Sequence, residues 1–172
     1  MTMKRAVGLV LLLFWLGLSV YADTAEKNSA PDRTRIPKSG KTLLSAMSPK
    51  GKANVTIETV TIEGSCLKAC PTASFMTESG ADDASVVQHL SISIDDKLIA
   101  VPPSVYSGLF NIMWASVNYK NDSFDLTINE GVDLYLVHIY FSSRYGITRM
   151  TVYDYVTAKV VEDARFYQAV IK

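Results

Sequence analysis

The sequence predicts a mostly β protein, an antiparallel meander of seven to eight strands with one short helix. The strands are expected to form either a sandwich-like pair of layers or one curved sheet. Two observations predict this class. Most aromatic residues of the mature chain lie between Met113 and Val156. In that stretch and before it, short runs of alternating apolar and polar residues are separated by turn sequences, as in successive hairpins.

The clearest hairpin surrounds the sequence Lys120-Asn121-Asp122-Ser123. If these residues form the loop, one register places every apolar side chain on one face and every polar side chain on the other. The predicted pairs are Tyr119 with Phe124, Val117 with Leu126, Ala115 with Ile128, Asn118 with Asp125, and Ser116 with Thr127. A slip of one residue would mix the two faces, so the pattern specifies its own pairing.

The chain begins with the features of a signal peptide over residues 1–22. Lys4 and Arg5 precede an apolar run from Ala6 to Val20, and Val20-Tyr21-Ala22 fits a signal peptidase site. A retained membrane anchor is the alternative, but the run is shorter than the about 20 apolar residues that a spanning helix needs. We therefore expect an exported protein, periplasmic or secreted, with no stable membrane insertion after cleavage.

Residues 23–53 are expected to form a disordered basic linker, and residues 54–172 a single antiparallel β domain. The linker carries seven basic and three acidic side chains and is interrupted by proline and glycine. Residues 54–172 carry eight basic and fourteen acidic side chains, so the domain is acidic. The first strand of the domain runs from Asn54 to Gly64, with a β-bulge or bend expected at Glu58-Thr59.

The only two cysteines of the chain, Cys66 and Cys70, follow this strand. In an exported protein they are expected to form a disulfide that closes a short local loop. Their spacing is not the two-residue spacing of thioredoxin-like sites, and neither histidine is adjacent in the sequence, so we do not expect a redox or metal site.

The elements that follow can be assigned in chain order. An acidic loop contains Glu78, Asp82 and Asp83. It precedes a strand in which Leu90, Ile92 and Ile94 alternate with polar residues, and Pro102-Pro103 ends the next strand. Ser104 can cap a short helix that ends at Phe110.

Beyond the hairpin, the strand from Val132 to Phe141 is apolar on both parities, which predicts a central position in a sheet. The length of its preceding loop decides the face of His138. With Glu130-Gly131-Val132 as the loop, His138 shares a face with Phe124, whereas with Glu130-Gly131 as the loop it lies on the opposite face. At the end of the chain, residues 159–171 are compatible with either a strand or a helix.

Signatures of catalysis are few. The sequence has no phosphate-binding glycine loop, no nucleophile elbow and no His-Glu-x-x-His motif, and it predicts neither a cofactor nor a metal site. His138 is the one candidate general base, with Asp133 and Asp154 as possible orienting acids, and the alternative is a packed core histidine. The acidic domain also argues against nucleic-acid binding. The sequence therefore leans away from an enzyme without excluding one.

The best candidate binding surface lies on the last hairpin. If Phe141 faces Ile147, then Tyr135 faces Tyr153, Ile139 faces Arg149 and Asp133 faces Tyr155. The resulting surface of Tyr135, Arg149, Tyr153 and Tyr155 has the composition favoured at protein interfaces, and its alternative is an aromatic core with hydroxyls at the rim. The acidic loop with Glu78, Asp82 and Asp83 is the next candidate.

These observations favour a small exported, non-catalytic protein that acts by binding another protein, in an inhibitor-like or immunity-like role. An acidic surface would then speed encounter with a basic enzyme. The second hypothesis is a periplasmic ligand-binding module with an aromatic-lined pocket beneath the Ser104 helix. A hydrolase that uses His138 is the third.

Overall fold

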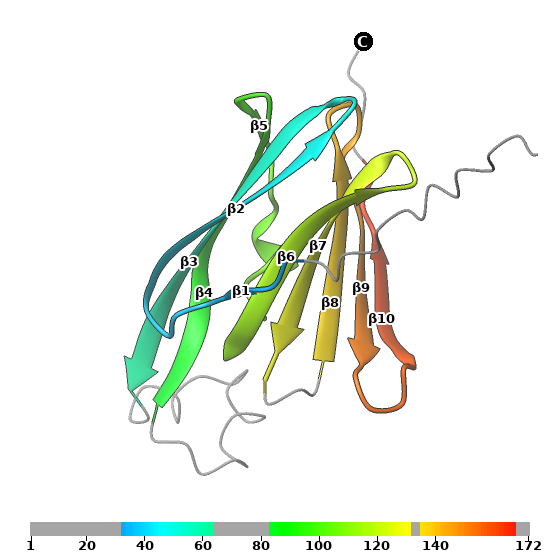
Figure 1. Ribbon diagram of the computed structural model, residues 1–172. Coiled ribbons are helices and arrows are strands. Elements are labelled where there is room, and N and C mark those ends of the chain that lie inside the picture. Colours follow the sequence, from blue (N-terminus) through cyan, green and yellow to red (C-terminus); the bar gives the residue numbers. More distant parts are fainter. Residues whose placement is uncertain (1–31, 64–82, 132–134, 168–172) are drawn as a thin grey trace, which may run out of the picture. The chain divides into compact units, whose positions relative to one another are not determined.

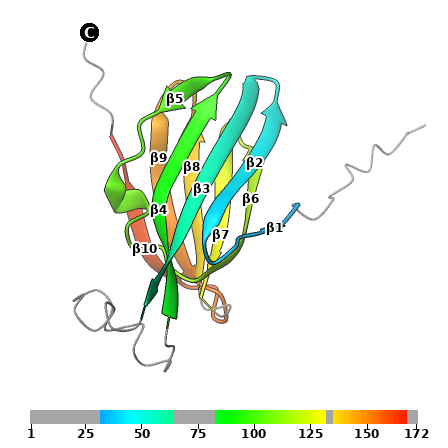
Figure 2. The ribbon, with the colours of Figure 1, turned by 90° about the vertical axis from the view of Figure 1, so that its left-hand side faces the viewer.

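The computed structural model describes residues 32–63, 83–131 and 135–167. They form two antiparallel sheets that face each other (Figures 1 and 2). The larger sheet has the strand order β1-β6-β7-β8-β9-β10, and the smaller has the order β2-β3-β4-β5. The larger sheet contains β1 (Thr34–Arg35), β6 (Ile112–Lys120), β7 (Ser123–Glu130), β8 (Tyr135–Ser142), β9 (Gly146–Asp154) and β10 (Val160–Arg165). The smaller contains β2 (Gly40–Ser48), β3 (Gly51–Glu63), β4 (Asp83–Ile94) and β5 (Lys97–Ile99). The predicted antiparallel β class is confirmed.

One hydrophobic core lies between the sheets. It is built from the inward-facing alternate residues of both, as expected for a two-layer β domain. Its largest fully buried side chains include Ile57, Leu90 and Ile92 of the smaller sheet and Leu126, Ile139 and Phe141 of the larger.

The β6–β7 hairpin has the predicted register. All five predicted pairs occur, from Tyr119 with Phe124 to Ala115 with Ile128. Asn121 and Asp122 form the turn with φ values of 51° and 63°, a conformation that Asn and Asp adopt more readily than most residues.

The prediction of a disordered linker over residues 23–53 is wrong from Thr34 onward. This part of the chain forms β1, β2 and the start of β3. Leu44 and Ala53 alternate with more exposed neighbours and are only 5% and 0% exposed. The basic composition is compatible with a strand because β2 lies at the edge of its sheet, where charged side chains reach solvent.

Pairing of charges also changes the expected contrast between a basic tail and an acidic domain. Three basic side chains of the predicted linker reach acids of the predicted domain. The ion pairs are Lys38–Asp83 (3.2 Å), Lys41–Glu58 (3.0 Å) and Lys50–Asp122 (2.9 Å). The two regions therefore belong to one folded unit and partly neutralise each other.

The predicted irregularity at Glu58-Thr59 is present in the β3–β4 pairing. Glu58 pairs with His89 and Thr59 pairs with Val87, so Gln88 of β4 is the extra residue. The phase of β4 changes at this point, whereas β3 continues to bury Ile57 and Thr59.

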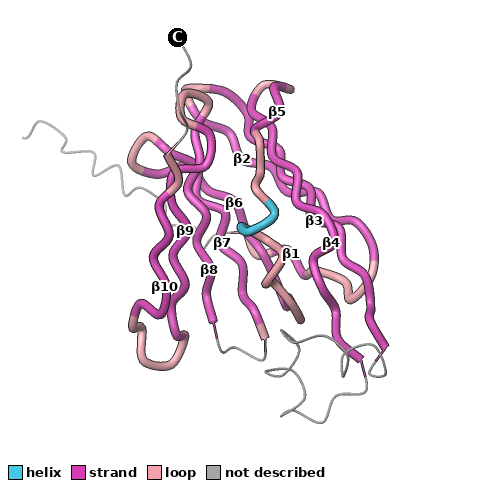
Figure 3. Tube along the Cα trace, turned by 180° about the vertical axis from the view of Figure 1, so that it is seen from behind, coloured by secondary structure: helices cyan, strands magenta, loops and turns pink. Residues whose placement is uncertain are grey.

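The predicted helix from Ser104 to Phe110 is replaced by a shorter element. A 3-10 helix, η2 (Pro103–Val105), is followed by turns that lead to β6. Figure 3 shows η2 in cyan between the sheets, and Figure 2 shows it beside β4 and β10. Pro102 and Pro103 fix the entry to η2, and Gly108 lies where the predicted helix would have had its last turn.

The structure also decides two alternatives that the sequence left open. Glu130 pairs with Tyr135, so the β7–β8 connection is longer than either predicted loop. His138 pairs with Thr127 and lies on the face opposite Phe124. Within residues 159–167, Val160–Arg165 form the strand β10.

Candidate functional site

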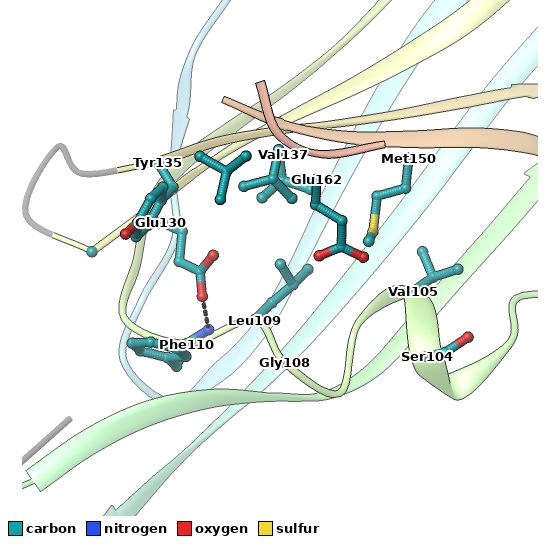
Figure 4. A pocket seen from close by; sticks show the side chains of 13 residues that line it. Ser104, Val105, Gly108, Leu109, Phe110, Glu130, Tyr135, Val137, Met150 and Glu162 are labelled. Carbon is teal, nitrogen blue, oxygen red and sulfur yellow. Dashed lines mark hydrogen bonds between the residues drawn. The ribbon is translucent and has the colours of Figure 1, made fainter. Parts of the chain in front are cut away.

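A cavity opens between η2 and the inner face of the larger sheet. Its volume is about 500 Å³. It is bounded on one side by residues 103–111, which begin with η2 and are called the η2 segment, and on the other by β7, β8, β9 and β10 (Figure 4). It lies beneath the Ser104 segment, where the ligand-binding hypothesis places its pocket. The lining residues are Ser104, Val105, Gly108, Leu109, Phe110, Glu130, Gly131, Tyr135, Val137, Met150, Val152, Val161 and Glu162.

The walls of the cavity are mostly apolar because they continue the inner faces of the strands. Val137 and Val152 pair across β8 and β9 on this face. Val161 is an extra residue in β10, between the pairs Val160–Tyr153 and Glu162–Val152. This bulge lets both Val161 and Glu162 line the cavity.

Hydrogen bonds connect the η2 segment, which covers the cavity, to both sheets. The Val87 N–H donates to the Leu109 carbonyl (3.1 Å), and Asn111 exchanges two bonds with Ser85. On the other side, the Phe110 N–H donates to Oε1 of Glu130 (3.1 Å). These bonds fix a segment that has little regular structure of its own.

Glu130 is the buried polar group of this site. Its side chain extends from the last position of β7 into the cavity, and the residue is only 7% exposed. Burial disfavours the ionised form and raises the pKa of Glu130 from 4.5 to about 7, although the hydrogen bond from Phe110 acts in the opposite direction. The carboxyl group therefore changes its charge near neutral pH.

The burial of Glu130 could have been predicted from the sequence. It was missed because Glu130-Gly131 was assigned to a loop instead of Glu130 being included in the strand. Phe124, Leu126 and Ile128 share one parity of β7, and Glu130 is the next residue of that parity. An acid at the end of an otherwise apolar face points toward the core. Parity along β7 could therefore have identified this buried acid.

The predicted surface of Tyr135, Arg149, Tyr153 and Tyr155 is divided between two faces. Phe141 does pair with Ile147, but a register shift follows between Tyr140 and Phe141. Arg149 therefore pairs with Tyr140, and Tyr153 pairs with Leu136. The predicted pairs Tyr135–Tyr153 and Ile139–Arg149 are wrong because the sequence gives no sign of this bulge.

As a result, Tyr135 lines the cavity on the inner face, opposite Asp154 in register. Tyr155 lies in the turn after β9 and is 45% exposed. Arg149 and Tyr153 remain together on the outer face of the larger sheet. Arg149 donates two hydrogen bonds to Asp163 of β10, at 2.7 and 3.0 Å.

The outer face of the larger sheet carries a polar and aromatic cluster that we call the tyrosine face: His138, Tyr140, Arg149 and Tyr153. The His138 ring stacks beside Tyr140 (6.1 Å between centroids) and meets Tyr153 edge-on (5.4 Å). Burial, with a smaller contribution from Asp125, raises the pKa of the Tyr140 hydroxyl. All four residues are partly exposed.

An acid does lie within reach of His138, but it is not one of those predicted. Asp125 Oδ2 is 3.0 Å from His138 Nδ1. Asp154 instead accepts the backbone N–H groups of Val156 and Thr157, and Asp133 lies outside the described residues. The hydroxyl of Thr127 also lies near this ring, with Oγ1 at 3.4 Å from the same Nδ1. Within the described chain, this arrangement supplies an oriented histidine without an aligned nucleophile.

Three polar side chains on the same outer face are buried without a hydrogen-bond partner in the described structure. They are Ser116, Asn129 and Thr151, with exposures of 1%, 0% and 0%. Their neighbours include Trp114, which pairs with Asn129 and carries the guanidinium of Arg33 over its ring at 4.2 Å.

Several predicted site residues lie outside the described residues: the signal peptide, the Cys66–Cys70 pair, and Glu78 and Asp82 of the acidic loop. Asp83 is the one residue of the predicted acidic surface that is described. It begins β4 and forms the ion pair with Lys38.

In the described part of the chain, no three potential ligands group in a way that could hold a metal ion. The same part contains no helix that is long and apolar enough to cross a membrane. Comparison with known proteins finds no matching family model, no matching curated protein and no matching solved structure.

Proposed function

We propose that this chain is a non-catalytic binding protein whose ligand is a small, largely apolar molecule held in the cavity beneath η2. The observation that carries the proposal is the cavity itself. Its volume of about 500 Å³ falls within the about 300–1,000 Å³ typical of ligand sites. Apolar walls with a few polar groups are the usual composition of such sites.

Gly108 allows a direct test of the cavity. It lines the cavity, and an added Cβ there would meet no atom within 4 Å. A Gly108→Phe variant should therefore fold and occupy space that a ligand would need. Ser107→Phe is the matched control, because Ser107 is exposed, adjacent in sequence and not among the lining residues.

The measurement is the fluorescence of Nile red, a neutral apolar dye, titrated with the purified protein. The wild type and Ser107→Phe should give saturable enhancement with the same dissociation constant, and Gly108→Phe should give little. Circular dichroism would establish that both variants are folded. Equal enhancement in both variants would place the dye elsewhere and contradict the proposal.

The tyrosine face favours a second candidate function, the binding of another protein. Arg149, Tyr140 and Tyr153 are partly exposed on one sheet face, and tyrosine and arginine are enriched at the centres of interfaces. In this hypothesis the sheet face replaces the predicted four-residue surface. The ion pairs of Lys38, Lys41 and Lys50 leave less support for an acidic surface that steers a basic enzyme.

The test for this candidate compares two variants as baits for the native exported fraction. Tyr153→Ala should weaken retention of a partner and leave the thermal midpoint nearly unchanged. Thr56→Ala, on the smaller sheet, is the control. A large stability loss in Tyr153→Ala with retained partner binding would show that Tyr153 is structural.

A further inference from the structure

The charged groups that line the cavity within the described part of the chain are all of one sign. Glu130 projects from the end of β7, and Glu162 projects from β10 (Figure 4). Among the residues that the structure describes, no lysine, arginine or histidine lines the cavity. The remaining lining side chains are apolar, apart from the hydroxyls of Ser104 and Tyr135.

The two carboxylates differ in their surroundings. Glu130 is 7% exposed, and Oε1 accepts the N–H of Phe110. No salt bridge to Glu130 or Glu162 occurs within residues 32–63, 83–131 and 135–167. Glu162 is exposed at the edge strand, so it lies at the rim of the cavity.

We propose that the ligand of this cavity carries a protonated amine on an apolar body, with the amine held by Glu130. This inference rests on the proposed function and adds the chemical class of the ligand. A buried carboxylate without a cationic partner is costly, and an ammonium group supplies the missing charge together with hydrogen-bond donors. The apolar body would lie against Val105, Val137 and Met150, which form the walls.

The protonation of Glu130 makes the affinity for a cation depend on pH. Its pKa is raised to about 7 by burial, so the free protein carries a neutral carboxyl below neutrality. The titratable groups of the described residues that share the cavity with Glu130 are Glu162 from β10 and Tyr135 from β8. Neither the η2 segment nor β9 contributes a charged lining residue. An ammonium ligand selects the ionised form, so its binding should weaken as the pH falls below about 7 and should release a proton there.

The experiment compares three ligands of the same chain length: n-octylamine, 1-octanol and octanoate. Each is titrated calorimetrically into the wild type, Glu130→Gln and Glu162→Gln. The amide introduced by Glu130→Gln retains an oxygen that accepts the Phe110 N–H, so the variant removes the charge while preserving the contact and the volume. Glu162→Gln removes the exposed acid and is the matched control.

At a pH of about 8 we expect octylamine to bind the wild type about ten- to a hundredfold more tightly than octanol, the effect of a charge-assisted hydrogen bond. Glu130→Gln should bring the two ligands to similar affinity, and Glu162→Gln should have a smaller effect. In the wild type, octylamine affinity should fall by up to about tenfold for each pH unit below 7, while octanol affinity stays constant.

Failure of this inference can be distinguished from failure of the proposed function. If octanol or octanoate binds the cavity as well as octylamine, the amine assignment is overturned and the apolar site stands. If none of the three ligands binds, and if Gly108→Phe enhances Nile red fluorescence as much as the wild type does, the amine assignment and the proposed function are both overturned. The wild-type pH series needs no variant, so it decides the inference even if Glu130→Gln does not fold.

Discussion

The Glu130 carboxylate accepts the backbone N–H of Phe110 at 3.1 Å. Phe110 also forms a β-bridge with Val86 of β4. A single residue of the connecting segment therefore contacts a strand of each sheet, and Glu130 is the side chain that ties it to the larger one. The same carboxyl group therefore has two roles. It accepts a backbone hydrogen bond that holds the connecting segment, and it is the buried acid of the cavity.

The first prediction concerns Glu130 and the pH dependence of stability. The folded pKa of about 7 is higher than the ordinary 4.5. The folded state therefore binds the proton more tightly than the unfolded state, and the wild type loses stability as the pH rises from about 4.5 to about 7. The shift corresponds to a loss of about 3 kcal/mol at most.

Glu130→Gln should lack this dependence. Urea unfolding of both proteins at a pH of about 4.5 and about 8 should show that the variant gains stability relative to the wild type as the pH rises. The wild type and Glu130→Gln have all other carboxyl groups in common, so the titration of those groups cancels in the stability difference between the two proteins. A difference that is the same at both pH values would contradict the raised pKa.

The second prediction compares adjacent residues of β7. Leu126 is 0% exposed, whereas Thr127 is partly exposed on the outer face. Leu126→Ala should cost about 2–5 kcal/mol of unfolding free energy because it leaves a cavity in the core. Thr127→Ala should cost far less. Chemical denaturation of the two variants measures the contrast, and equal losses would argue against the alternating burial of β7.

The third prediction concerns Gly51, which starts β3 with φ of 122°. An added Cβ there would collide with the carboxylate of Asp95, whose Oδ1 accepts the N–H of Lys52 at 2.8 Å. Gly51→Ala should therefore destabilise the protein by about 1–3 kcal/mol through backbone strain and loss of this contact. Gly108→Ala is the control, because space is open there, and it should be neutral or stabilising by up to about 1 kcal/mol. Thermal unfolding of both variants tests this difference.

The fourth prediction concerns Thr151, whose buried hydroxyl has no hydrogen-bond partner in the described structure. Thr151→Val keeps the shape and the branched Cβ, and it removes a polar group that is costly to bury. We expect the variant to be more stable by about 1–3 kcal/mol in urea unfolding. Destabilisation would show that the hydroxyl is satisfied in solution, for example by a bound water.

Alternation along strands was the part of the fold that could be predicted from the sequence. The β6–β7 register was predicted correctly because Tyr119, Val117 and Ala115 all face apolar partners in only one pairing. The β8–β9 register was wrong because a bulge adds one residue without any marker in composition. The strand β2 was also missed, since its apolar residues do not alternate with polar ones: Leu43 and Met47 are exposed and Leu44 is buried. It nevertheless pairs with β3 along nine residue pairs.

Of the predicted binding residues that the structure describes, only Tyr135 lines the cavity. Ser104 was expected to cap a short helix with a pocket beneath it, and the cavity lies beneath the shorter element η2. Glu130 of β7 and Glu162 of β10 line the same cavity although two other strands separate β7 from β10 in the sheet. That residues of two distant strands line one cavity depends on the tertiary arrangement, which spacing along the chain does not reveal.

The position of β10 has a consequence for how molecules could enter and leave. This strand is both a wall of the cavity and the edge of the larger sheet, and among the described strands it pairs with β9 alone. Edge strands detach locally at a free energy below that of global unfolding, so their amide hydrogens exchange with solvent sooner than those of central strands. Fraying of β10 would withdraw Val161 and Glu162 while β7 and β8 stay in place. The residence time of a bound molecule would then be set by the local opening of β10. It would lengthen if β10 were prevented from separating from β9.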